Sequence, residues 1–113
     1  MANLDTVFHG LADPTRRAVI TRLAGGPAAV SELAAPHKMA LPSFLKHLKV
    51  LEEAGLVKSR KLGRVRTCAL EIDAMAQVER WITDRKRFWE QQYDQLEAYL
   101  ASTALEEKTD DSH

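Results

Sequence analysis

Five basic side chains lie close together between residues 58 and 66, with no acidic residue among them. The five are Lys58, Arg60, Lys61, Arg64 and Arg66. The β-branched Val57 and Val65 on either side of Gly63 predict a two-stranded hairpin over residues 56–70. Like charges on facing strands repel one another unless a polyanion neutralises them. This composition therefore favours a nucleic acid as the partner of the hairpin.

A second group of polar side chains precedes the hairpin, on a segment predicted to be helical from Leu41 to Ala54. Its apolar positions define a buried face: Leu41, Phe44, Leu48 and Leu51. The outer face then carries Pro42, Ser43, Lys46 and Lys49, with His47 at its edge. Lys46 and His47 can donate to guanine acceptors or to phosphate, and Ser43 near the helix N-terminus suits a phosphate oxygen. Taken alone, these polar residues are equally well explained as an ordinary solvent-exposed helix face, but the neighbouring basic hairpin favours contact with DNA.

The net charge of zero hides a strong segregation of charge along the chain. Residues 14–66 hold eleven Lys and Arg against three Asp and Glu, a net charge of +8. Residues 1–13 carry −2 and residues 67–113 carry −6. A basic middle between acidic ends is typical of a protein that presents one positive face to an anionic polymer.

Four further helices are predicted around these two groups. Leu4 to Leu11 has the apolar spacing of a short amphipathic helix, and Asp13 and Pro14 begin a second helix that runs to about Ala24. A very short helix at 29–35 ends before Pro36, and a long apolar and aromatic helix starts at Asp73. The predicted fold is mainly α, a winged helix-turn-helix with the order α-α-α-α-β-β-α. We expect one domain over residues 1–101, followed by a disordered acidic tail at 102–113.

Three sequence runs resemble the ArsR family of winged helix-turn-helix transcriptional repressors, over about residues 4–100. They are GLADPTRRAVITRLAGG, VSELAA and MALPSFLKHLKVLEEAGLVKSRKLGRVRTCAL. The resemblance implies a homodimer formed by the first and last helices, with helix 41–54 in the major groove and hairpin 57–70 as the wing. This sequence departs from many members of the family at Ala40 and Leu45, where those members have Ser. A helix cap and a polar DNA contact are therefore missing.

We assign sequence-specific DNA binding to a set of polar and basic residues: Ser43, Lys46, His47, Lys49, Arg60, Lys61, Arg64 and Arg66. We assign dimerisation to apolar residues of the first and last helices: Leu4, Phe8, Trp81, Phe88, Trp89, Tyr93 and Leu96. Two-fold symmetry would place two recognition helices roughly 34 Å apart, so the operator should be an imperfect palindrome. The aromatic residues of the last helix could alternatively line a pocket for a small apolar effector, whose existence and identity stay open.

Other classes of function have little support in the sequence. Ala29 and Ser31 occupy the places of a metal-binding Cys-x-Cys pair in the resembling family, and Cys68 with His9, His37, His47 and His113 does not assemble a ligand set, so we expect no metal or other cofactor. Cys68 is expected to be a small core residue, with a redox role as the alternative. No grouping of catalytic residues, signal peptide or membrane span is recognised, so a cytoplasmic protein that is not an enzyme is expected. The alternative is a helical interaction module whose basic face binds an acidic partner protein.

Overall fold

The computed structural model describes the backbone of residues 3–111 and the side chains of residues 3–105. The chain divides into two compact units, Met1–Val78 and Glu79–His113, where the sequence predicted one domain over residues 1–101. The first unit contains all predicted DNA-binding residues. The second consists of the long last helix beyond its first turns.

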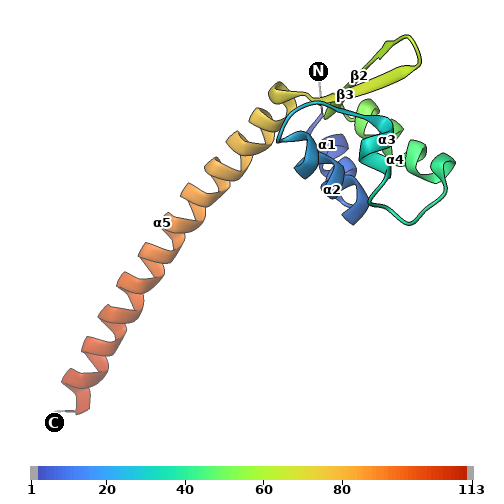
Figure 1. Ribbon diagram of the computed structural model, residues 1–113. Helices are drawn as coiled ribbons and strands as arrows, with labels where there is room; N and C mark the ends of the chain where they lie inside the picture. The colour runs from blue at the N-terminus through green and yellow to red at the C-terminus, as the bar shows by residue number, and fades with distance from the viewer. Residues whose placement is uncertain (1–2, 112–113) are drawn as a thin grey trace. The chain divides into compact units, whose positions relative to one another are not determined.

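The order of helices and strands confirms the predicted winged helix-turn-helix and adds one short strand (Figure 1). The elements are α1 Leu4–Leu11, α2 Pro14–Leu23, β1 Ala28–Ala29, α3 Val30–Ala34, α4 Leu41–Glu53, β2 Val57–Leu62, β3 Val65–Leu70 and α5 Ile72–Asp111. The strand β1 pairs antiparallel with β3, with Ala28 opposite Cys68, so the sheet has three strands in the order β1-β3-β2. Two consecutive alanines carry no alternation of polar and apolar residues, which is why the sequence did not predict β1.

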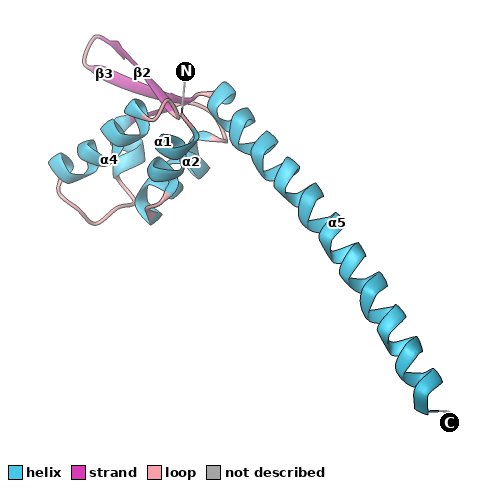
Figure 2. Ribbon diagram, turned by 180° about the vertical axis from the view of Figure 1, so that it is seen from behind, coloured by secondary structure: helices cyan, strands magenta, loops and turns pink. Residues whose placement is uncertain are grey.

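The first unit is built around a core to which every one of its elements contributes. Its buried residues are Val7, Val19, Ile20, Leu23, Ala28, Leu33, Phe44, Leu48, Leu51, Ala54, Leu56, Val57, Cys68, Ala74 and Val78. The helices α1, α2 and α4 pack against one another, and α4 also contacts β2 (Figure 2). Leu41 was predicted to lie on the buried face of α4, but 54% of it is exposed. That part of the prediction was wrong because Leu41 is the first residue of the helix, before the packing against α1 and α2 begins.

Helix α1 approaches the rest of the core closely at Gly10. A Cβ atom at this position would lie 3.0 Å from Leu56 Cδ1 and 3.2 Å from the Ala54 Cβ. Glycine therefore allows α1 to lie against the end of α4 and the start of β2. This packing fixes the position of the C-terminus of α1.

In the second unit, every residue of α5 from Glu79 to Leu105 is exposed except Thr103. The helix continues to Asp111, although we expected disorder after residue 101; residues 112 and 113 lie outside the described part of the chain. The continuation has a physical reason, because Ala101, Ala104 and Leu105 are good helix formers and Thr103 Oγ1 donates to the Tyr99 carbonyl at 3.0 Å. No helix in the described residues is both long and apolar enough to cross a lipid bilayer.

Candidate nucleic-acid interface

Helix α4 presents the outer face that its sequence spacing predicted. Phe44, Leu48 and Leu51 are buried, whereas Ser43, Lys46 and Lys49 are exposed. Lys49 lies 3.9 Å from the Glu53 carboxylate, but both side chains are mostly in solvent, so this contact restrains Lys49 weakly. The helix begins at Leu41, and the N-cap residue Ala40 offers no side-chain cap, so the amides of the first turn are left to solvent or to a ligand.

His47 differs from these three because it is held against helix α2. Its Nδ1 atom lies 3.1 Å from Arg16 Nη1 and 3.6 Å from Asp13 Oδ2, and about a quarter of its side chain is exposed. Asp13 caps α2, since its carboxylate accepts from the Arg16 amide at 3.0 Å. This hydrogen bond lowers the pKa of Asp13, with the nearby His47 ring and Arg16 guanidinium acting in the same direction and partial burial opposing them.

The motif DPTRR joins α1 to α2 through two arginines that were not predicted from the sequence to be functional. Arg16 donates through Nε to the Gly10 carbonyl at 2.8 Å and through Nη2 to the His9 carbonyl at 3.0 Å. Arg17 donates to the Leu11 carbonyl at 2.9 Å. These are the last carbonyls of α1, which have no partner inside the helix, so both arginines cap its C-terminus. The position of Arg16 two residues after Pro14, in the first turn that Asp13 caps, was the available signal.

The wing is the hairpin β2–β3, and its cations lie on two different faces. The register pairs Lys61 with Arg66 and Ser59 with Cys68, on the face that also buries Val57. We call this the inner face. Lys58 pairs with Ala69, Arg60 with Thr67 and Leu62 with Val65 on the opposite face, which we call the outer face. The predicted contacts Lys61 and Arg66 therefore point to one side of the wing and Arg60 to the other.

The tip of the wing is a two-residue turn formed by Gly63 and Arg64. Gly63 has a φ of 62°, and no non-glycine residue of the described chain has a positive φ. A glycine with positive φ at the first central position, followed by a residue without positive φ, fits a type II′ turn, whose twist suits a hairpin. Arg64 is exposed, so the tip offers its cation to solvent or to a phosphate.

Arg66 is engaged inside the protein. It forms an ion pair with Glu52 of α4, and its Nε and Nη2 atoms donate to Ser59 Oγ at 3.2 Å. The Ser59 hydroxyl in turn donates to Glu52 at 2.8 Å. The charge of Arg66 is thus neutralised by a carboxylate, and the network ties the inner face of the wing to α4. Neither Glu52 nor Ser59 was singled out from the sequence.

Two acidic side chains from outside the hairpin lie beside its basic residues, although the hairpin sequence itself contains no acidic residue. Besides Glu52 beside Arg66, Glu71 lies 3.9 Å from Lys58 Nζ. Arg60, Lys61 and Arg64 form no ion pair within the described part of the chain. These three wing cations are available for phosphate without breaking an ion pair.

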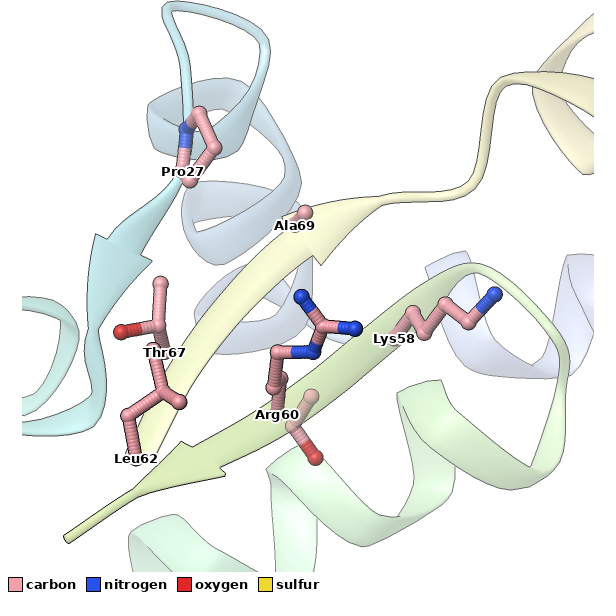
Figure 3. Close-up of a pocket in the computed structure, with 7 residues that line it drawn as sticks. Pro27, Lys58, Arg60, Leu62, Thr67 and Ala69 are labelled. Carbon is pink, nitrogen blue, oxygen red and sulfur yellow. The ribbon is translucent and has the colours of Figure 1, made fainter. Parts of the chain in front are cut away.

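The outer face of the wing contains a shallow hollow of about 510 Å³. Figure 3 shows Lys58 and Arg60 of β2 beside Thr67 and Ala69 of β3, with Pro27 at one end. The remaining lining residues are Ser59 and Leu62. The hollow is open and carries two cations, so it can accommodate an anionic group near the wing.

Cys68 is fully buried in β3. Burial raises the pKa of its thiol, which disfavours the reactive thiolate that a redox role requires. In the described residues, no three side chains of the His, Cys, Asp and Glu types come together in a way that could hold a metal ion.

The residues assigned to dimerisation differ in their surroundings. Leu4 packs against the core from α1, whereas Phe8 is more exposed. On α5 the large apolar side chains are 40–67% exposed: Trp81, Phe88, Trp89, Tyr93 and Leu96. A shallow hollow of about 230 Å³ is lined by Trp89, Gln92, Tyr93 and Leu96 of this helix alone.

Two helices joined by a turn, an exposed polar face on the second, and a following basic hairpin define a winged helix-turn-helix DNA-binding domain. Residues 11–60 match the model of a helix-turn-helix domain family. The HTH-type transcriptional regulator Rv2034 of Mycobacterium tuberculosis is 44% identical over 85 residues, which cover 75% of this chain and 77% of that protein. The transcriptional repressor SdpR of Bacillus subtilis is 30% identical over 61 residues, 54% of this chain and 68% of that protein.

A solved structure shares both the sequence and the fold. The crystal structure of the ArsR family transcriptional regulator RHA00566 is 54% identical and superposes with a TM-score of 0.73. The match covers 77% of this chain and 96% of that one. The chain belongs to the ArsR family of transcriptional regulators.

Proposed function

We propose that this chain is a homodimeric repressor that binds a palindromic operator, with α4 in the major groove and the wing on the phosphate backbone. The observation that carries the proposal is the exposed face of α4. Ser43, Lys46 and Lys49 share this face, and the same compact unit carries Lys61 and Arg64 on the wing. Polar side chains of a recognition helix read base edges, and wing cations neutralise phosphates.

Helix α5 is the proposed dimerisation element. Ile82, Trp89 and Leu96 recur at intervals of seven residues and are at least half exposed. This repeat is typical of helices that pair along their length. Burying one such side chain is worth about 2 to 3 kcal/mol, and a two-fold interface buries each residue twice. We also assign Phe8 and Leu4 of α1 to dimerisation.

Dimerisation gives the repressor its specificity. Each protomer would read one half-site, and two-fold symmetry would place the second half-site about one turn of DNA, ~34 Å, away. A dimer bound over a promoter would exclude RNA polymerase. The name of the related SdpR, a transcriptional repressor, supports repression over activation.

The test is selection of DNA from a random duplex library by the full-length protein, followed by footprinting of the enriched duplex and sedimentation of the complex. We expect enrichment of an inverted repeat with half-site centres about 10 base pairs apart, bound by two chains and weakened by salt. Binding that shows no sequence preference, or one chain per enriched site, would contradict the proposal. Tight binding to an acidic protein without any enriched duplex would favour an interaction module.

A further inference from the structure

The guanidinium of Arg16 holds two parts of the first unit at once. Nε and Nη2 donate to the Gly10 and His9 carbonyls of α1, and Nη1 contacts His47 Nδ1 on α4 at 3.1 Å. All three nitrogens of the guanidinium thus have different acceptors. A group fixed at two points on α1 has little freedom to rotate, so the direction of its third donor is also fixed.

This contact determines which nitrogen of the His47 ring carries the proton. An arginine in a protein is always protonated and can only donate, so His47 Nδ1 must be the acceptor. The Asp13 carboxylate is the other group near Nδ1, but at 3.6 Å it lies beyond hydrogen-bond range and already accepts from the Arg16 amide. The neutral ring therefore carries its hydrogen on Nε2.

The Nε2 atom of His47 reaches the protein surface. No polar side-chain atom of a described residue is buried without a partner, and the contacts of His47 within that part of the chain are both made through Nδ1. Nε2 is consequently not enclosed by the protein, and about a quarter of the His47 side chain is exposed. His47 lies on α4 one residue after Lys46, at the edge of the exposed face.

We propose that Arg16 is a positioning residue that fixes His47 as a hydrogen-bond donor toward operator DNA. The inference rests on the proposed function for its ligand. An Nε2–H group can donate to guanine N7 or O6, adenine N7, thymine O4 or a phosphate oxygen, but it cannot accept from the cytosine amino group. Arg16 acts without touching DNA, by excluding the tautomer that would accept at Nε2.

The first test uses free protein and needs no operator. Imidazole nitrogen shifts of His47 are measured by NMR at about pH 8, where an ordinary histidine is neutral. We expect one tautomer with the hydrogen on Nε2 in the wild type and in Arg17→Ala, the matched control, because Arg17 caps α1 without contacting His47. In Arg16→Lys the share with hydrogen on Nδ1 should rise, since Asp13 remains as its nearest partner. Hydrogen on Nδ1 in the wild type, or an unchanged ring in Arg16→Lys, would overturn the proposal.

The second test compares binding to the duplex enriched by the wild-type protein with binding to a shuffled duplex. Arg16→Lys and His47→Ala should each weaken operator binding about three- to tenfold, the range of one hydrogen bond, and change shuffled-duplex binding less than twofold. The double variant should bind no more weakly than His47→Ala, because Arg16 acts through His47. Additive losses would assign Arg16 a separate structural role and overturn the inference.

A further variant keeps the test decisive if Arg16→Lys folds poorly. His47→Asn offers Arg16 an acceptor near the position of Nδ1 but has no donor at the position of Nε2. We expect an unchanged melting temperature and the same operator-specific loss as in His47→Ala; unchanged operator binding would overturn the proposal. If no duplex is enriched, the proposed function fails, and the NMR measurement still decides whether Arg16 sets the tautomer.

Discussion

Glu52 on α4 and Arg66 on β3 form an ion pair that joins this helix to the wing. The Glu52 side chain is 25% exposed and that of Arg66 is 39% exposed, so the pair is partly withdrawn from solvent. Ser59 completes the arrangement, since it accepts from Arg66 and donates to Glu52. Arg66 is therefore a predicted DNA contact whose charge is already balanced by a partly buried carboxylate within the domain.

Replacing Arg66 with Ala should affect stability more than DNA binding. The change leaves Glu52 partly buried without its cation, which should lower the free energy of unfolding by roughly 1 to 3 kcal/mol in a urea titration. Arg64→Ala is the matched control, because it removes the same charge from the exposed tip. A variant of Arg66 with normal stability and a reduced salt dependence of DNA binding would instead make Arg66 a phosphate contact.

The wing tip should contribute affinity without sequence preference. Replacing both Lys61 and Arg64 with Ala removes two unpaired cations, so binding to all duplexes should weaken alike. The slope of log K against log salt concentration should fall by about 0.9 for each phosphate that the variant no longer neutralises. The slopes are measured on the enriched and on a shuffled duplex; weakening confined to the enriched duplex would mean that the wing reads bases.

Lys46 should behave in the opposite way. It lies on the exposed face of α4, where a base contact gives discrimination, so Lys46→Ala should cost roughly 1 to 3 kcal/mol on the enriched duplex and much less on shuffled DNA. Arg22→Ala serves as the control, since Arg22 is an exposed cation of α2 that pairs with Glu32. Equal losses on both duplexes would reassign Lys46 to the phosphate backbone.

A charge placed on the apolar stripe of α5 should dissociate the proposed dimer. Trp89→Glu would bury a carboxylate in the proposed interface, so sedimentation at micromolar concentration should give a monomer that has lost palindrome binding. Gln91→Glu adds the same charge two residues away, on another side of the helix, and should remain dimeric. A dimeric Trp89→Glu variant that binds normally would show that another surface forms the dimer.

The cap of α2 should give stability a defined pH dependence. The Arg16 amide lowers the pKa of Asp13, so the charged carboxylate is favoured in the folded state. The contribution of the charged Asp13 carboxylate to the free energy of unfolding is complete above its ordinary pKa of 3.8. This contribution is lost as the pH falls through the lower pKa of the folded state. Asp13→Ala should therefore cost about 1 kcal/mol at pH 7, and the difference should shrink below pH 3.8. Chemical unfolding across this range measures it, with the exposed Asp84→Ala as control; a constant difference would contradict the assignment.

The helices and the hairpin could be predicted because their signals are local. Asp13 and Pro14 mark a helix start, and Gly63 between β-branched residues marks a turn. The contacts that shape the site are not local in sequence, and charge counting cannot detect them. Arg16 meets His47 across 31 residues, and Arg66 meets Glu52 across 14.

The end of α5 could not be predicted from the sequence, for a different reason. The acidic composition after residue 101 is typical of disorder, yet it is also compatible with a helix when alanine and leucine are interspersed. Composition does not distinguish the two states there. The backbone is helical to Asp111.

The alternation of faces along the wing restricts how its length can vary. Val57 and Cys68 lie on the inner face in the core, while Arg60 lies on the outer face. Deleting one residue from β2 between Val57 and Arg60 would shift the pairing by one position beyond the deletion and turn Arg60 to the inner face. Adding one residue to each strand beside the Gly63 turn would lengthen the wing and leave the pairing at its base unchanged. Wings of this type should therefore tolerate insertions in symmetric pairs at the tip and reject single insertions within a strand.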